Sequence, residues 1–326
     1  MNARTDTRPG VVTTPERKFP SFDQPVPTDG YRWWYVDALS DDGRHGLTLI
    51  VFIGSVFSPF YAAARRLGPA EPLEYCAVNV ALYGPRRRWA LTERGTAGVS
   101  ADPGHLTIGP NALRWNGSTL VAQIDERGSP VRTPIRGELR IHPESLTEHE
   151  VSLDSTGDHH WWPVAPASRI EVALTEPALQ WSGRGYFDSN RGNSPLERAF
   201  NGWTWSRALT PNGTRIHYDV NCRGGERTEI AALVRHSGAV ETIERPIRAR
   251  LPATLLWRIP RETRSETGTA RVVQTLEDTP FYSRSVVRAR QGGQDVTAVH
   301  ESLSLDRFAT RWVQRLIPYR MSRLEK

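Results

Sequence analysis

The sequence predicts a mostly β protein built from two antiparallel β-barrel or sandwich halves, with few short helices. Three observations predict this class. Aromatic and β-branched residues recur in short runs, and turn-forming residues separate these runs at regular spacing. Roughly fifteen to eighteen such runs are present, about twice the number that one small barrel uses. Helix signals occur at only two places, and 326 residues suit one large or two ordinary domains.

The strands of the first half begin with YRWWYVDALS (31–40) and HGLTLIVFIG (45–54), and the turn residues between them indicate a hairpin. CAVNVALYG (76–84) and RWALTERG (88–95) flank a second turn. The segment 104–127 repeats the strand–turn–strand pattern around Asn-Gly. Later runs in this half are IRGELRIHP (135–143) and SRIEVALTEPALQWSGRGYF (168–187).

The second half continues the same pattern after the stretch GRGYFDSNRG. We therefore place the boundary near residues 177 to 195 and divide the chain into a flexible segment (1–29), an N-terminal domain (30–182) and a C-terminal domain (183–326). The runs of the second half are WTWSRALTPNGTRIHYDVNCRGGERTEIAALV (203–234), IRARLPATLLWRI (247–259), ARVVQTLEDTPFYSRSVVRAR (270–290) and DVTAVHESLSL (295–305).

Two segments carry helix signals. SPFYAAARRLG predicts one short helix, with Ser58 as its N-terminal cap and Gly68 as its stop. LDRFATRWVQRLIPYRM predicts a second helix, in which apolar residues recur at spacings of three and four while arginines occupy the other faces. Such a basic amphipathic helix either packs on a barrel or contacts anionic lipid head groups.

The composition excludes several functional classes. The net charge is +6, but the basic residues are interspersed with acidic ones and no nucleic-acid-binding motif is present, so we predict no nucleic-acid partner. The two cysteines lie far apart without a CxxC partner, which argues against a zinc site and a disulfide framework. The longest apolar run is shorter than the ~20 residues that a spanning helix needs.

The stretch GDHHWWPVAP combines imidazole and indole groups. Because side chains alternate between the two faces of a strand, His159 and Trp161 should share one face, and His160 and Trp162 the other. One interpretation is a packed tryptophan beside a hydrogen-bonded histidine, and the other is a functional site. No third ligand stands at a regular spacing, so we predict no metal.

The stretch GRGYFDSNRG raises the same question for a carboxyl group. Tyr186 and Asp188 should share one face of a strand, although Asp beside Ser, Asn and Gly is also common in turns. Five tryptophans lie nearby in the sequence: Trp161, Trp162, Trp181, Trp203 and Trp205. A carboxyl group that such aromatic side chains shield from water has a raised pKa and stays protonated near neutral pH.

Other acidic and aromatic groups are weaker candidates. Asp37 lies among strongly apolar neighbours, and LEDTPFYSRS contains Glu277 and Tyr282. RIHYDV would place His217 and Asp219 on one face. There is no P-loop, no GxGxxG after a strand, no GxSxG and no HExxH, so nucleotide-dependent chemistry has no visible site.

With these residues in view, the chain resembles the bacterial carotenoid 1,2-hydratases, also called hydroxyneurosporene synthases. The resemblance runs from about Tyr31 to the C-terminus and rests on long tryptophan-rich blocks. These blocks are YRWWYVDALSDDGRHGLTLIVFIGSVFSPFYA, CAVNVALYG, RWALTERG, HHWWPVAP, GRGYFDSNRGNSPLERAFNGWTWSRA, LEDTPFYSRS and ESLSLDRFATRWVQRLIPYRM.

The resemblance implies two lipocalin-like halves and the addition of water to the terminal C1–C2 double bond of acyclic carotenoids such as neurosporene and lycopene. It implies no metal or organic cofactor, and peripheral contact with the cytoplasmic side of the inner or photosynthetic membrane. It also implies that a His, a Trp, a Tyr and an Asp are needed for activity. By motif and position these are His159, Trp161, Tyr186 and Asp188, while relatives often carry Arg in place of His160.

The residues agree with this chemistry. An alkene is a very weak base, so its protonation needs a strong acid held close in a dry site, and a protonated Asp188 would supply it. Aromatic faces would stabilise the resulting tertiary cation, and His159 would orient the acid or the attacking water and later take up a proton. We expect the substrate to contact Trp162, Trp181, Trp203, Trp205 and Tyr282, and the membrane to contact Phe57, Phe60, Tyr61, Phe308 and Trp312.

Two other readings remain open at this point. A related cyclase or isomerase would use the same acid but let an internal double bond capture the cation. A non-catalytic carrier would shield an apolar ligand with aromatic side chains and would need no buried acid.

Overall fold

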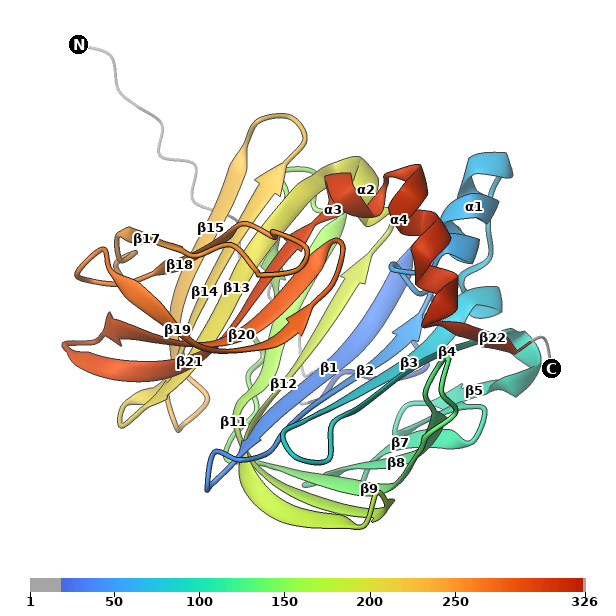
Figure 1. The fold of residues 1–326 in the computed structure, drawn as a ribbon, viewed down its shortest axis with the longest axis horizontal. Helices are drawn as coiled ribbons and strands as arrows, with labels where there is room; N and C mark the ends of the chain where they lie inside the picture. Colours follow the sequence, from blue (N-terminus) through green and yellow to red (C-terminus); the bar gives the residue numbers. More distant parts are fainter. Residues whose placement is uncertain (1–18, 325–326) are drawn as a thin grey trace.

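The computed structural model describes residues 19–324, and Figure 1 shows two curved β-sheets packed against each other. The first sheet contains thirteen of the described strands. They are β1 (Tyr31–Ser40), β2 (Gly46–Ile53), β3 (Cys76–Tyr83), β4 (Arg88–Arg94), β5 (Val99–Asp102), β6 (His105–Ile108), β7 (Asn111–Trp115), β8 (Leu120–Arg127), β9 (Pro134–Pro143), β10 (Val151–Ser152), β11 (His159–Glu176), β12 (Leu179–Gly192) and β22 (Ser322–Leu324).

The order of the first sheet is β22-β4-β3-β2-β1-β12-β11-β9-β8-β7-β6-β5, and β10 pairs with β11. The sheet curls so far that β4 and β8 meet, where the Thr92 hydroxyl and the Arg94 guanidinium both donate to Glu126. The terminal strand β22 lies parallel to β4, and Arg323 pairs with the buried Glu93. The remaining neighbours along the sheet are antiparallel, as the hairpin turns predict.

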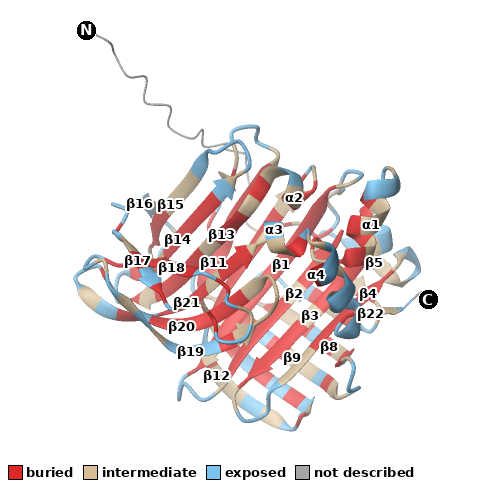
Figure 2. Cartoon of the chain, turned by 45° about the horizontal axis from the view of Figure 1, so that its top comes forward, coloured by how far each residue is buried: buried red, intermediate tan, exposed pale blue. Residues whose placement is uncertain are grey.

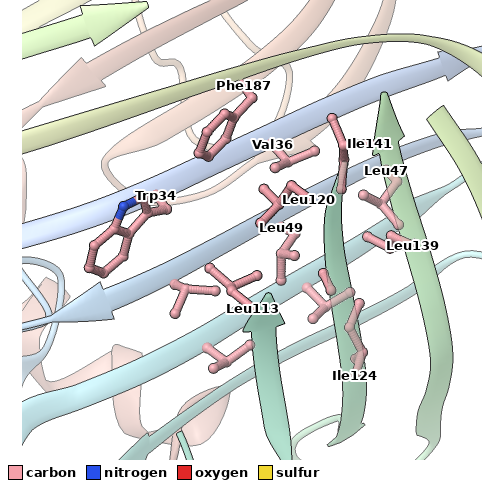
Figure 3. Packing of buried hydrophobic residues seen from close by; sticks show 14 of the residues in the cluster. Trp34, Val36, Leu47, Leu49, Leu113, Leu120, Ile124, Leu139, Ile141 and Phe187 are labelled. Carbon is pink, nitrogen blue, oxygen red and sulfur yellow. The ribbon is translucent and has the colours of Figure 1, made fainter. Parts of the chain in front are cut away.

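The inside of the curl is a dense apolar core. Figure 3 shows its packing, with Trp34 and Val36 from β1 and Phe187 from β12 above aliphatic side chains from the strands opposite. These residues alternate in sequence with residues on the outer face, because successive side chains of a strand point to opposite sides. The curl is therefore filled with side chains, and the outer face of β1, β11 and β12 remains for contact with the second sheet.

The second sheet has the order β16-β15-β14-β13-β21-β20-β19, and the hairpin β17–β18 lies beside it. In Figure 1 it forms the yellow-to-red half of the molecule. Its strands are β13 (Phe200–Thr210), β14 (Gly213–Cys222), β15 (Arg227–Val234), β16 (Val240–Thr242), β19 (Ala270–Asp278), β20 (Tyr282–Gln291) and β21 (Gln294–Ser304), and the hairpin pairs β17 (Arg248–Leu251) with β18 (Arg261–Arg264).

The contact between the two sheets is a second buried cluster, rich in aromatic residues. It joins Trp33 and Tyr35 of β1 and Tyr186 of β12 to Trp205 of β13 and Tyr218 of β14. Figure 2 shows buried residues along most strands of both sheets, including β1 and β13. The mostly β class with two lipocalin-like halves is thus confirmed.

Helices are short and lie at one end of the sheets (Figure 1). The first predicted helix is confirmed, because the Ser58 hydroxyl accepts from the N–H groups of Phe60 and Tyr61, and Gly68 ends the helix. The helical elements are α1 (Pro59–Leu67), η1 (Pro72–Tyr75), η2 (Thr96–Gly98), α2 (Leu196–Ala199), α3 (Leu305–Phe308), α4 (Arg311–Leu316) and η3 (Ile317–Tyr319).

The C-terminal segment is not the single helix that its periodicity predicts. The Thr310 hydroxyl donates to the Arg307 carbonyl, and the chain turns there between α3 and α4. The turn allows the Phe308 ring to remain completely buried while α4 lies on the surface. Burial of one aromatic ring therefore prevails over a continuous amphipathic pattern.

Two expected boundaries can be compared with the strands. The first sheet includes all of β12 to Gly192 and the second begins at Phe200, so the sheets divide after residue 192, inside the expected range of 177 to 195 and ten residues beyond the division at 182/183. Of the segment 1–29, residues 1–18 lie outside the described residues. Phe22 is fully buried, and the Phe19 ring stacks on Trp115 at 4.1 Å, so residues 19–29 include part of the first core.

Candidate active site

A buried carboxyl group lies where the two sheets meet. Asp188 of β12 is 5% exposed, and three side chains donate hydrogen bonds to it. The Trp161 Nε1–H and the Tyr186 hydroxyl donate to Oδ2 at 2.9 Å and 2.8 Å, and the Asn190 amide donates to Oδ1 at 3.1 Å. Strand alternation brings Tyr186 and Asn190 to the face of Asp188, and β11 places Trp161 opposite Asn190.

The surroundings keep this carboxyl group protonated near neutral pH. Burial raises the pKa of Asp188 from its ordinary value to about 8, although the hydrogen bonds from Trp161 and Tyr186 act in the opposite direction. The charges of Glu301 and Asp37 raise it further. The donors around Asp188 are neutral, so no cation in direct contact compensates for the loss of hydration. The group is therefore an acid and not a carboxylate at pH 7.

Asp188 faces a small cavity of about 40 Å³ between the sheets. Its lining is Trp33, Tyr35, Asp188, Asn190, Trp203, Trp205, Tyr218 and Glu301. Two polar atoms of these lining residues, Trp205 Nε1 and Asn190 Oδ1, are buried without a hydrogen-bond partner. The cavity therefore combines aromatic walls with a free donor and a free acceptor, which suits a bound water molecule.

A network of ion pairs adjoins the cavity and joins the two sheets. Arg207 of β13 donates from Nε to the Asp37 carboxylate of β1 at 2.9 Å, and Arg284 of β20 pairs with Glu301 of β21. The Tyr35 hydroxyl lies 2.9 Å from Asp37 Oδ2 and 2.8 Å from Glu301 Oε1. Each buried charge thus has an opposite partner, as buried ions require.

His159 is brought to the same face but does not contact Asp188. Its Nδ1 lies 2.9 Å from the Tyr31 hydroxyl and its Nε2 lies 3.2 Å from the Ser194 hydroxyl. Burial lowers its pKa, so the ring is neutral near pH 7. A Cβ atom at Gly192 would lie 2.4 Å from Cε1 of Tyr31 and 2.5 Å from Nδ1 of His159, so only glycine at this position leaves room for the two rings.

The structure separates the expected substrate-binding residues into two groups. Trp203 and Trp205 line the cavity, and Tyr282 accepts a hydrogen bond from Arg284 Nε on the same side of the second sheet. Trp162 and Trp181 instead pack in the core of the first sheet, on the far side of the strands. The physical reason is the alternation of side chains along a strand. Trp162 lies one residue from Trp161 on β11, and Trp181 lies seven residues from Asp188 on β12, so both point away from the cavity.

The residues expected at a membrane also divide. Tyr61 and Phe308 are completely buried, which corrects the expectation that their rings face outward. Phe57 is half-buried and its ring packs on Phe308 at 6.1 Å, and Phe60 is also half-buried. Trp312 is 48% exposed on α4.

Several groups in and beside the cavity escaped the sequence analysis, which considered Asp37 but not its partners. Arg207 follows Trp203 and Trp205 at the same two-residue spacing along β13, so it lies on the same face of the strand. A charged residue on a face that is otherwise aromatic indicates a buried ion pair or a site. Glu301 occupies a comparable position between buried residues of β21. Their pairing with β1 and β20 is a long-range contact that local sequence does not specify.

No metal centre or membrane span is visible in the described part of the chain. Within residues 19–324 no three His, Cys, Asp or Glu side chains gather as metal ligands would. Within the same range no helix has the length and apolar character needed to cross a bilayer.

Comparisons with known proteins place the chain in a family. The family described as carotenoid hydratase CrtC matches residues 49–326. The chain is 53% identical to the acyclic carotenoid 1,2-hydratase of Thiocapsa roseopersicina over 94% of this chain and 76% of that protein. It is 49% identical to the protein of the same name from Rubrivivax gelatinosus over 93% and 76% of the two chains.

Solved structures resemble the fold at low sequence identity. A protein described as AttH from Nitrosomonas europaea superposes with a TM-score of 0.57 at 12% identity, over 84% of this chain and 92% of the other. CghA with Sch210972 gives a TM-score of 0.52 at 11% identity, over 91% and 97%. These likenesses concern the arrangement of the two sheets.

Proposed function

The chain belongs to the carotenoid hydratase family, and from that premise we propose that it is a hydro-lyase acting on acyclic carotenoids. The reaction adds water across the terminal C1–C2 double bond. One observation carries the mechanism: Asp188 is a buried, protonated carboxyl group beside an aromatic cavity that suits a water molecule.

Asp188 is the proton donor in this proposal. Its Oδ2 accepts two hydrogen bonds, from Trp161 and Tyr186, whereas Oδ1 accepts only one, from Asn190, so the acidic proton is placed on Oδ1. Transfer of that proton to C2 leaves a tertiary cation at C1 and an aspartate. The same two donors then stabilise the new charge, because hydrogen bonds to the ionised form become stronger. Trp161 and Tyr186 therefore act by supporting the conjugate base.

The aromatic walls stabilise the cation that protonation creates. The faces of Trp33, Trp203 and Trp205 adjoin the cavity, and a desolvated cation–π contact contributes about 2 kcal/mol. The cavity is smaller than the roughly 150 Å³ of a cavity that binds benzene. Entry of the carotenoid end group therefore displaces side chains that line the cavity. Once the end group fills the cavity, only the water molecule that reacts has room there.

His159 serves as a positioning residue in this scheme. Its two ring nitrogens are already occupied by Tyr31 and Ser194, and its partners do not include Asp188. It fixes the end of β11 next to Trp161, two residues along the same face. Loss of His159 should therefore disturb the Trp161–Asp188 hydrogen bond indirectly.

The first experiment is a product assay without added cofactor. Purified protein is incubated with lycopene in liposomes in ¹⁸O-labelled water, beside Asp188→Asn and the control Asp295→Asn, an exposed carboxylate. We expect labelled hydroxylated carotenoid from the wild type and the control only. Labelled product from Asp188→Asn would remove the acid from the mechanism. An unlabelled, rearranged product would indicate a cyclase or isomerase, and bound but unchanged lycopene a carrier.

We further propose that the protein works at the surface of an anionic membrane. The support is a groove of about 680 Å³ between α1 and α4, which Arg66, Arg311 and Arg315 line. Exposed apolar side chains adjoin these arginines, namely Leu67, Trp312, Leu316 and Tyr319. Cationic and apolar groups together are what an interfacial lipid contact uses.

Vesicle flotation tests the membrane proposal. The variant Arg311→Gln/Arg315→Gln removes two charges from the groove, and each contributes about 1 kcal/mol near an anionic surface, so binding should fall about 30-fold. The matched control is Arg271→Gln/Arg288→Gln, an exposed cross-strand pair on the second sheet. Equal loss in both variants would show that only net charge matters, and no loss would refute the proposed surface.

A further inference from the structure

The cavity has a second carboxyl group on the wall opposite Asp188. Glu301 comes from β21 of the second sheet, whereas Asp188 comes from β12 of the first. Both groups line the same space, and the charge of Glu301 contributes to the raised pKa of Asp188, so the two groups interact through the cavity. Hydration has two proton transfers, one to carbon and one from water, and two carboxyl groups can divide them.

The partners of the two carboxyl groups differ in a way that assigns these tasks. Asp188 has only neutral donors, whereas Glu301 has the guanidinium of Arg284 and the Tyr35 hydroxyl, both at Oε1. A guanidinium in contact favours the carboxylate form. Arg284 is itself 1% exposed, so this pair is shielded from water. One side of the cavity therefore presents an acid and the other a carboxylate.

We propose that Glu301 is the general base that removes a proton from the water molecule as its oxygen bonds to C1. The inference rests on the hydratase function proposed above. Asp188 transfers its proton to C2, and the C1–C2 π electrons form the new C–H bond. A lone pair of water forms the C1–O bond, and one water proton passes to Glu301. The product leaves with one added water, and Glu301-H returns its proton to Asp188 through cavity water.

The network around Glu301 fits a proton acceptor. Arg284 holds its carboxylate in place, and the single proton of the Tyr35 hydroxyl is shared between Glu301 and Asp37, which Arg207 neutralises. Burial raises the pKa of Glu301 and Arg284 opposes that rise, which makes the group a stronger base than an exposed glutamate. An effective general base has a pKa near the operating pH.

Deuterium exchange separates the acid step from the base step. In D₂O, Asp188 carries deuterium and places it on C2 of the substrate. If capture of the cation by water is slow, the cation instead loses the original C2 proton to Asp188. The carotenoid is then recovered without added water but with deuterium on C2. We expect Glu301→Gln to lower kcat for hydration about 100-fold or more, with KM little changed, while deuterium still enters recovered carotenoid. Asp188→Asn should lose both hydration and exchange.

Two further variants control for folding. Glu301→Gln leaves the positive charge of Arg284 without its main partner. The double variant Glu301→Gln/Arg284→Gln removes both charges, and it should also show deuterium exchange without hydration. Glu277→Gln removes another glutamate of the second sheet that accepts a tyrosine hydrogen bond, outside the cavity lining, and should hydrate normally. Circular dichroism and thermal melting accompany each protein.

The outcomes distinguish this inference from the function on which it rests. Exchange without hydration in both Glu301 variants supports Glu301 as the base. Hydration by Glu301→Gln at the wild-type rate overturns the inference and leaves Asp188 to recover the water proton. Loss of exchange together with hydration in folded Glu301 variants also overturns it, because Glu301 would then act on the acid step. Absence of hydration by the wild type would remove the proposed function itself, and hydration by Asp188→Asn would remove only Asp188 as its acid.

Discussion

Replacement of Asp188 by Asn should change how the stability of the folded protein depends on pH. The asparagine has nearly the shape of the protonated acid, and its side-chain oxygen can still accept from Trp161 and Tyr186. Burial raises the folded-state pKa of Asp188 to about 8, whereas an unfolded aspartate titrates near 4. The wild type must therefore keep a proton on folding that its unfolded chain releases, and the variant need not.

The sign and size of the effect follow from this shift. Because the folded-state pKa is raised, the contribution of the group is complete below about pH 4 and is lost as the pH rises through about 8. Between these values folding takes up one proton, so each pH unit lowers the free energy of unfolding by about 1.4 kcal/mol. From pH 5 to pH 7 the wild type should lose about 3 kcal/mol relative to Asp188→Asn.

Urea denaturation at pH 5, 6 and 7, followed by tryptophan fluorescence, measures this difference directly. Other buried titratable groups are present in both proteins and cancel in the comparison. Asp295→Asn, at an exposed carboxylate, should follow the wild type at every pH. A constant difference between wild type and Asp188→Asn from pH 5 to pH 7 would mean that Asp188 is ionised in the folded protein, which would refute the reasoning.

Three further predictions concern the same interface. The hydration rate should fall about tenfold from pH 7 to pH 9, because the protonated fraction of Asp188 falls from about 0.9 to about 0.1; a flat alkaline limb in the pH–rate profile would contradict this. Gly192→Ala should destabilise by about 1–3 kcal/mol in urea, because its Cβ meets the rings of Tyr31 and His159, whereas Gly224→Ala, with nothing within 4 Å, should not. Arg207→Met should cost about 3–5 kcal/mol, because it leaves Asp37 buried without its main cation; a thermal shift near zero would count against that pairing.

Strand alternation allowed the heart of the site to be predicted from sequence. The two-residue period alone places Trp161 with His159 and Tyr186 with Asp188, and the structure joins Trp161 to Asp188 by a hydrogen bond. The same period also shows why Trp162 and Trp181 lie on the far side of the first sheet. The expectation that both contact the substrate came from counting nearby aromatic residues, although the alternation already placed Trp162 on the face opposite Trp161.

Other parts of the site depend on contacts that sequence pattern does not encode. The opposition of Asp188 and Glu301 requires that β12 and β21 face each other across two sheets, 113 positions apart in the chain. The break between α3 and α4 arises because Phe308 fits into the core, which periodicity cannot foresee. Tertiary packing therefore decides where local patterns leave more than one arrangement available.

The parallel strand β22 has a consequence for the order of events during synthesis. It covers the edge of β4, yet it is made some 230 residues later, after the whole second sheet. A nascent chain therefore carries the first sheet with the β4 edge unpaired, and an unpaired edge invites pairing with other chains. Emergence of β22 from the ribosome closes that edge and seats Arg323 on Glu93. Protection of the β4 edge against aggregation thus has to wait until the second sheet has been made.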